Sequence, residues 1–193
     1  MQRGDRSGQK GLERVGGRRI IDRVADALRG MTPDLVVAAN DPSASEWLPG
    51  TPAVPDIHPG TGGLAGVEAA LQYAAGADVV VVAWDMPFVT SGVLRLLLDA
   101  ARAHAADVAL PESDSPYGVE PFCAAYTARV RPALTDYLAR GGGPASDFLR
   151  ALPRLHRVPA SAFAALGETH RIFFSVNTPE DLRRAQAMDE IAE

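Results

Sequence analysis

The stretch VVVVAWDMPF, residues 79–88, decides the fold. Its four consecutive valines are β-branched and apolar on both faces, which is typical of a strand in the middle of a parallel sheet. Asp85-Met86-Pro87 ends this strand. A carboxylate at the end of a buried strand is costly unless it has a partner. Asp85 is therefore the first candidate for a functional residue, with a simple cap of the Met86-Pro87 turn as an equally weighted alternative.

Helical and strand patterns alternate on both sides of this run. Apolar residues at helical spacing predict helices over 20–28, 64–74, 92–105, 128–140, 145–152 and 179–191. Short apolar runs predict further strands over 35–39, 53–54, 108–110, 121–126 and 171–176. This alternation predicts one α/β domain over residues 1–193. It should hold a single doubly wound, mainly parallel sheet with helices on both faces.

Composition and length exclude several classes of protein. The 193 residues are 47% apolar and 22% charged, which fits a globular domain and excludes disorder, collagen and coiled coil for the whole chain. No apolar run approaches the roughly 20 residues that cross a bilayer. The N-terminal segment is charged without an apolar core, unlike a secretory signal. The single cysteine, Cys123, cannot form an internal disulfide, so a cytoplasmic location is expected.

Charge is concentrated at the start of the chain. Residues 1–23 hold seven basic and three acidic side chains, whereas the whole chain carries −5. A basic segment of this kind suits a nucleic-acid arm, a site for a polyanionic small molecule, or a solvated terminus. The acidic remainder argues against nucleic-acid binding, which usually needs a broad basic face.

Ligands of doubly wound sheets bind beyond the carboxyl ends of the strands, and this rule selects Asn40 and Asp56 beside Asp85. Asp85 could hold Mg²⁺, which takes one or two protein carboxylates together with substrate phosphates. Asp56 could hold a metal or a ribose and Asn40 a base or a sugar, although both lie in turn-forming sequence. Lys10, among glycines, could neutralise a phosphate, although a surface lysine is the commoner case.

Other chemistries lack their motifs. The four histidines and the one cysteine have no zinc-ligand spacing. No G-x-S-x-G elbow is present, which counts against an α/β-hydrolase. The four glycines within residues 60–66 would let backbone approach a ligand, but they do not form a full phosphate-loop signature.

Several segments taken together are similar to one family, the molybdenum cofactor guanylyltransferases of the nucleotide-diphospho-sugar transferase-like superfamily. They lie in the family's order: Lys10-Gly11-Leu12 with 15–18 (VGGR), 36–40 (VVAAN), Pro55-Asp56 with 63–66 (GLAG), 84–88 (WDMPF), 120–122 (EPF) with Ala125-Tyr126, and 176–182 (VNTPEDL). The resemblance covers nearly the whole chain.

This resemblance implies a Mg²⁺-dependent nucleotidyltransferase that moves GMP from GTP to the phosphate of molybdopterin and releases pyrophosphate. It implies that Lys10 neutralises the triphosphate and that Asp85 holds Mg²⁺. Asn40 and Asp56 would contact the guanine nucleotide, and Asn177, with Thr178, would lie on the molybdopterin side. The implied partners are GTP, molybdopterin and, in transient contact, molybdoenzymes or their chaperones. Neither nucleic acid nor a membrane is implied.

The sequence departs from the family in three places. The family begins with a strand and a Leu-Ala-Gly-Gly loop, whereas this sequence starts at Met1-Gln2-Arg3-Gly4, so we expect the N-terminal strand to be missing through a misassigned start or a truncation. Gly63 stands where the family usually has proline, and Ser175 stands where it often has asparagine. Two alternatives remain: a related enzyme that uses CTP or a sugar-phosphate acceptor, and a truncated, non-catalytic molybdopterin-binding relative.

Overall fold

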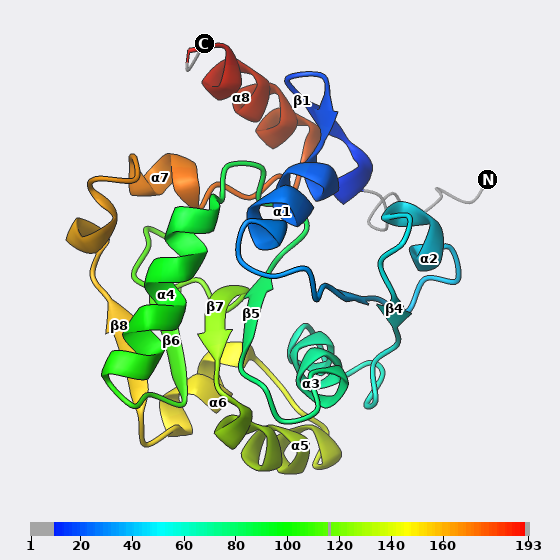
Figure 1. The fold of residues 1–193 in the computed structure, drawn as a ribbon, viewed down its shortest axis with the longest axis vertical. Helices are drawn as coiled ribbons and strands as arrows, with labels where there is room; N and C mark the ends of the chain where they lie inside the picture. The colour runs from blue at the N-terminus through cyan, green and yellow to red at the C-terminus, as the bar shows by residue number, and fades with distance from the viewer. Residues whose placement is uncertain (1–9, 116, 192–193) are drawn as a thin grey trace.

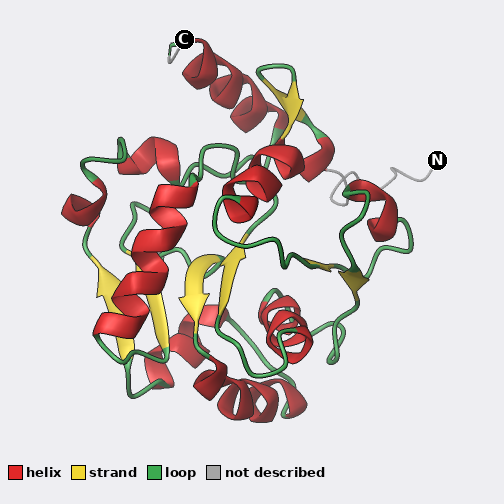
Figure 2. Ribbon diagram, in the orientation of Figure 1, coloured by secondary structure: helices red, strands yellow, loops and turns green. Residues whose placement is uncertain are grey.

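The valine run forms β5 (Val79–Val82) in a computed structural model that describes residues 10–115 and 117–191. β5 pairs with β7 (Cys123–Tyr126), which pairs with β6 (Val108–Pro111), which in turn pairs with β8 (Leu155–Val158). β7 runs antiparallel to both of its neighbours and β6 runs parallel to β8. β5, β6 and β8 therefore share one direction, with β7 reversed between them (Figures 1 and 2).

Helices cover both faces of this sheet, as the α/β prediction requires (Figure 1). The helices of the described residues are α1 (Ile20–Arg29), α2 (Ala44–Trp47), α3 (Leu64–Tyr73), α4 (Ser91–Ala103), α5 (Arg131–Ala139), α6 (Ala145–Ala151), α7 (Thr169–Ile172) and α8 (Pro179–Glu190). Successive side chains along β7 point to opposite faces of the sheet, so their neighbours show which helices lie on each face. Cys123 and Ala125 share a core with α4, whereas Ala124 and Tyr126 share one with α3, α5 and α6. The α/β class with helices on both faces is confirmed.

The sheet differs from the expected single one. β3 (Val37–Ala38) and β4 (Ala53–Val54) form a separate parallel pair, and β1 (Arg14–Val15) and β2 (Arg18–Arg19) form a small antiparallel hairpin. Among the described residues, β5 has a hydrogen-bonded neighbour on one side only. Its valines are consequently half-buried, not enclosed in the middle of a parallel sheet. α3 contacts β3, β4 and β5 and so bridges the two sheets.

The strand predicted over residues 171–176 is wrong. Residues 169–172 form the short helix α7, and the segment after it is a loop. Packing overrides the β-branched and aromatic pattern here, because Ile172 and Phe173 turn into the core of α4. Phe173 meets Phe163 edge to face, with ring centroids 5.2 Å apart. The strand missing from the prediction is β8, whose sequence, Leu-His-Arg-Val, carries two polar side chains.

Across the described residues, no helix combines the length and apolar character that crossing a membrane requires. Residues 1–9 of the basic N-terminal segment singled out above lie outside the described residues.

A stacked pair of histidines makes the stability of the fold pH-dependent. The rings of His104, which follows α4, and His156, on β8, lie 3.8 Å apart between centroids at an interplanar angle of 14°. Burial and the neighbouring His104 lower the pKa of His156. The unfolded chain therefore binds a proton more readily than the folded one, and the free energy of unfolding falls as pH drops below about 6.5.

Urea unfolding at pH 7 and pH 5 tests this expectation. His156→Gln should flatten the loss of stability between the two pH values, because its side chain takes up no proton. His170→Gln, outside the pair, should leave the loss unchanged. An identical pH dependence in the His156 variant and the native chain would contradict the assignment.

Candidate active site

Asp85 lies just beyond β5, where the chain returns from α7 toward α8. The Ser175 hydroxyl donates to Asp85 Oδ1 at 2.9 Å, and the Val176 N–H donates to the Asp85 carbonyl at 2.9 Å. Burial raises the pKa of the Asp85 carboxyl, and the Ser175 hydrogen bond and the positive charge of Lys10 offset part of that effect. Hydrogen bonds at Asp85 thus join the segment after β5 to the segment around Ser175, 90 residues away in the sequence.

Lys10 reaches the same place from the other end of the chain. Its Nζ donates to Asn177 Oδ1 at 3.1 Å. Gly11 allows this approach, because a Cβ at that position would lie only 2.6 Å from the ring of Trp84, the residue before Asp85. The structure therefore brings together Lys10, Asp85 and Asn177, three of the residues that the sequence predicts for the site.

Thr178 has a different setting. Its hydroxyl accepts from the Asp181 N–H at 3.1 Å, and Asp181 Oδ2 accepts from the Thr178 N–H at 2.9 Å and from the Asn177 N–H at 3.1 Å. This capping box begins α8 and fixes the backbone of Asn177. The Thr178 side chain is thereby engaged in the helix cap, next to Asn177.

Asn40 and Asp56 form a second group, at the carboxyl ends of β3 and β4. Asn40 Nδ2 donates to Asp56 Oδ2 at 2.7 Å, and the Asp56 N–H donates to Asn40 Oδ1 at 2.9 Å. Both residues line an open cavity of about 390 Å³ whose other walls are small: Ala38, Ala39, Gly60, Gly62, Gly63 and Gly66. Backbone and amide groups can therefore approach a ligand closely in this cavity.

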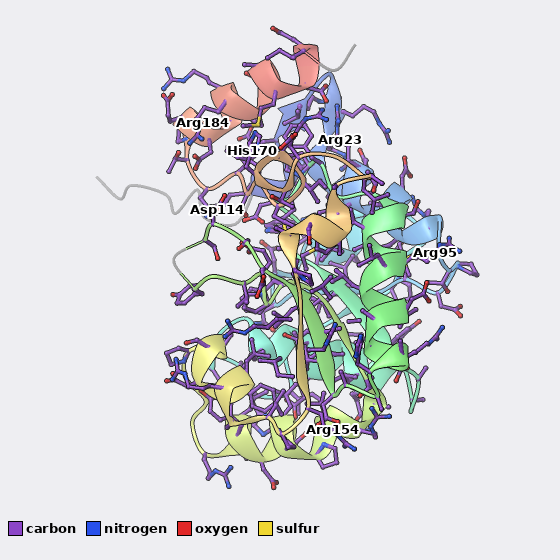
Figure 3. The ribbon with its side chains drawn as sticks, turned by 90° about the vertical axis from the view of Figure 1, so that its left-hand side faces the viewer. Arg23, Arg95, Asp114, Arg154, His170 and Arg184 are labelled. Atoms are coloured by element: carbon purple, nitrogen blue, oxygen red, sulfur yellow. The ribbon has the colours of Figure 1, made fainter. Side chains whose placement is uncertain are left out.

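A larger cavity of about 690 Å³ lies beside the Asp85 group. Ser175 and Asn177 line it, and so does Glu120 at the start of the segment leading into β7. Three phenylalanines, Phe122, Phe173 and Phe174, supply apolar wall. Figure 3 shows three charged or polar side chains of this cavity along one side of the molecule: Asp114, His170 and Arg184.

The two cavities share one wall. Gly62 and Gly63, in the loop that leads into α3, line both of them. The buried Glu68 side chain of α3 joins the segment before that loop to α5. His58 Nδ1 lies 2.7 Å from Glu68 Oε2, and the Thr135 hydroxyl donates to Glu68 Oε1 at 2.7 Å. The arrangement suits two ligands that meet across a glycine-rich loop.

Comparisons with known proteins show the family of this chain. Residues 2–158 match the model of the MobA-like NTP transferase domain. The chain belongs to the MobA-like NTP transferase family. It is 33% identical over 189 residues to a probable molybdenum cofactor guanylyltransferase of Pelotomaculum thermopropionicum, covering 97% of this chain and 89% of that protein. It is 30% identical over 182 residues to a molybdenum cofactor guanylyltransferase of Desulfosudis oleivorans, covering 93% and 87%.

A solved structure extends the likeness to three dimensions. Molybdopterin-guanine dinucleotide biosynthesis protein A of Archaeoglobus fulgidus superimposes with a TM-score of 0.81 at 27% identity, covering 97% of this chain and 94% of the other. The α/β nucleotidyltransferase fold of the MobA-like family is therefore confirmed for this chain.

Two of the three departures from the family pattern, Gly63 and Ser175, lie at the candidate site. A Cβ at Gly63 would lie 2.6 Å from the Phe122 ring, so in this MobA-like chain the phenylalanine fills the space beside the glycine. Ser175, at the position of the family asparagine, still supplies an oxygen beside Asp85.

The sequence did not single out Glu120, His170 or Arg184 as site residues. Glu120 is the first residue of one of the family-like segments, 120–122, and this was the sequence signal that could have identified it. His170 and Arg184 carry no motif of their own, and they line the cavity because the fold brings α7 and α8 to it.

Proposed function

We propose that this chain transfers GMP from GTP to the phosphate of molybdopterin and releases pyrophosphate. The observation that carries the proposal is the meeting of Lys10, Asp85 and Asn177 beside the larger cavity, next to the glycine loop that this cavity shares with the smaller one. In the reaction, an oxygen of the molybdopterin phosphate attacks the α-phosphorus of GTP, and the bond to the pyrophosphate breaks. This transfer depends mainly on positioning and on neutralising charge.

The smaller cavity is the proposed place of the guanine nucleotide. Asn40 and Asp56 offer amide and carboxylate groups at its edge, and the glycines leave room for the base and ribose. Lys10 would leave its hydrogen bond with Asn177 and neutralise the triphosphate, which a compact ammonium group does well.

Asp85 is the proposed holder of Mg²⁺. Its carboxylate, with the Ser175 hydroxyl beside it, supplies the hard oxygen donors that this ion prefers. Within the described part of the chain, no group of three or more His, Cys, Asp or Glu side chains could hold a metal. A site with few protein ligands fits Mg²⁺, which keeps waters and binds substrate phosphates. When bound, the ion would stabilise the charge that develops on the transferring group.

The larger cavity is the proposed place of molybdopterin. Three phenylalanine rings suit the flat faces of a pterin, and Asn177 stands at the end nearest Lys10 and Asp85. We further propose that residues 1–193 act as one nucleotidyltransferase-like domain in the cytoplasm and contact molybdoenzymes or their chaperones transiently. The buried single thiol of Cys123 is compatible with that reducing compartment.

Pyrophosphate release tests the choice of nucleotide. The chain, with Mg²⁺ and molybdopterin, should release pyrophosphate from GTP, and kcat/KM for GTP should exceed that for CTP by at least about 10-fold, the discrimination that about 1.4 kcal/mol supplies. Omitting molybdopterin should stop the release. A preference for CTP would replace guanylyl transfer by cytidylyl transfer, and molybdopterin binding without release from either nucleotide would indicate the non-catalytic alternative.

A further inference from the structure

Glu120 is held in place by its backbone on both sides. Its N–H donates to the Pro111 carbonyl at 3.2 Å, next to the antiparallel bridge between Glu112 and Val119. The carbonyl of Pro121 accepts a hydrogen bond of 2.8 Å from the buried hydroxyl of Tyr126. The position of Glu120 is therefore set by the sheet and does not depend on a free loop.

Within the part of the chain that the structure describes, the Glu120 carboxylate accepts a direct hydrogen bond at one of its two oxygens. Ser113 Oγ donates to Oε1 at 2.6 Å. The Ser115 hydroxyl donates to the Val119 carbonyl at 2.9 Å. It also lies close enough to the Glu120 carboxylate to lower the pKa of that group. Among residues 10–115 and 117–191, none donates a hydrogen bond to Oε2. The second oxygen therefore remains available, on a side chain that lines the larger cavity.

The surroundings of this oxygen select the kind of group it can bind. Burial raises the pKa of the Glu120 carboxyl, and the negative charge of Asp85 raises it further, while the Ser113 and Ser115 hydroxyls lower it. Away from Lys10 and from the metal proposed at Asp85, the Glu120 carboxylate would repel a phosphate. An N–H donor would instead satisfy a carboxylate that is partly removed from water. Phe122, in the same wall, offers a surface for a flat ring.

We propose that Glu120 is a specificity residue that accepts a hydrogen bond from a ring N–H or amino group of a heteroaromatic acceptor. This inference rests on the proposed function, in which the larger cavity holds the acceptor. An aminopyrimidine edge, such as that of a pterin, carries donors of this kind. A site built to pair with a polar group rejects analogues that lack it, because the buried carboxylate would then stay unpaired.

Steady-state kinetics with two variants tests the proposal. Glu120→Ala should lower kcat/KM for molybdopterin by about 10- to 100-fold, the loss that one hydrogen bond to a charged group produces, while KM for GTP changes less than about 2-fold. Glu120→Gln keeps the size of the side chain and an acceptor oxygen, so it should lose less. Glu112→Gln makes the same change of charge on an exposed side chain outside the cavity and should behave as the native chain.

The outcomes separate this inference from the proposed function. Equal losses toward GTP and molybdopterin, or an unchanged acceptor KM in Glu120→Ala, would overturn the role of Glu120. If the alanine variant does not fold, the same comparison with Glu120→Gln decides. If the native chain releases no pyrophosphate, the proposed function fails. Fluorescence titration with molybdopterin then tests the role of Glu120 separately from catalysis. Weaker binding by Glu120→Ala than by the native chain supports the contact, and equal binding refutes it.

Discussion

Asp85→Asn should reduce guanylyl transfer at saturating GTP and molybdopterin by at least about 10³-fold, because loss of the metal's charge stabilisation is worth several kcal/mol. Asparagine keeps an oxygen that can accept from the Ser175 hydroxyl, now 2.9 Å from Asp85 Oδ1. It removes the charge that binds Mg²⁺. Asp99→Asn, on the exposed side of α4, provides the matched change and should leave turnover unaltered.

The Asp85→Asn variant should nevertheless fold at least as well as the native chain at pH 7. Burial raises the pKa of Asp85, so the folded chain binds a proton at this carboxyl more readily than the unfolded chain does. The native chain then loses stability as pH rises through that pKa, and the asparagine variant does not. Thermal unfolding at pH 7 checks this sign. Turnover within 10-fold of the native rate, in a folded variant, would remove Asp85 from the metal site.

Lys10→Met should lower kcat/KM for GTP by about 10²-fold, because the triphosphate loses its counter-charge in a site partly closed to water. Methionine keeps most of the side-chain length, so the loss would reflect charge. Stability should change by less than about 0.5 kcal/mol, since the hydrogen bond between Lys10 and Asn177 is exposed.

Arg102→Met removes one positive charge from the exposed surface of α4 and controls for net charge. It should bind and turn over GTP as the native chain does. If Lys10→Met matched Arg102→Met in kcat/KM for GTP, Lys10 would be an ordinary surface lysine and the site would lack the proposed counter-charge.

The local sequence pattern predicted most helices and strands of the fold. It failed where contacts with residues distant in the sequence determine the structure. The valines of β5 do form a strand, but their burial depends on neighbours along the sheet, and the run carries no information about those neighbours. Residues 171–176 carry a strand-like pattern, yet Ile172 and Phe173 are bound to the core beneath α4 and form the end of a short helix. The polar β8 was missed for the opposite reason, because its pairing with β6 creates it.

The sequence predicted which residues belong to the candidate site better than it predicted how they are arranged. Position at strand ends selected Asn40, Asp56 and Asp85, and the structure joins Asn40 to Asp56 by two hydrogen bonds. Lys10 and Asn177 are separated by 167 positions, so no spacing rule could have paired them. Glu120 required the structure, because its significance lies in its place in the wall of a cavity and in an oxygen that accepts no hydrogen bond from the described residues.

Mass spectrometry of the reaction product tests the central claim most directly. The chain would be incubated with Mg²⁺, molybdopterin and an equal mixture of GTP and CTP, and the acceptor would then be recovered and identified. We expect molybdopterin that carries one GMP on its phosphate, formed together with an equal amount of pyrophosphate. Recovery of unchanged molybdopterin, or of molybdopterin carrying CMP, would contradict the assignment of this chain as a guanylyltransferase.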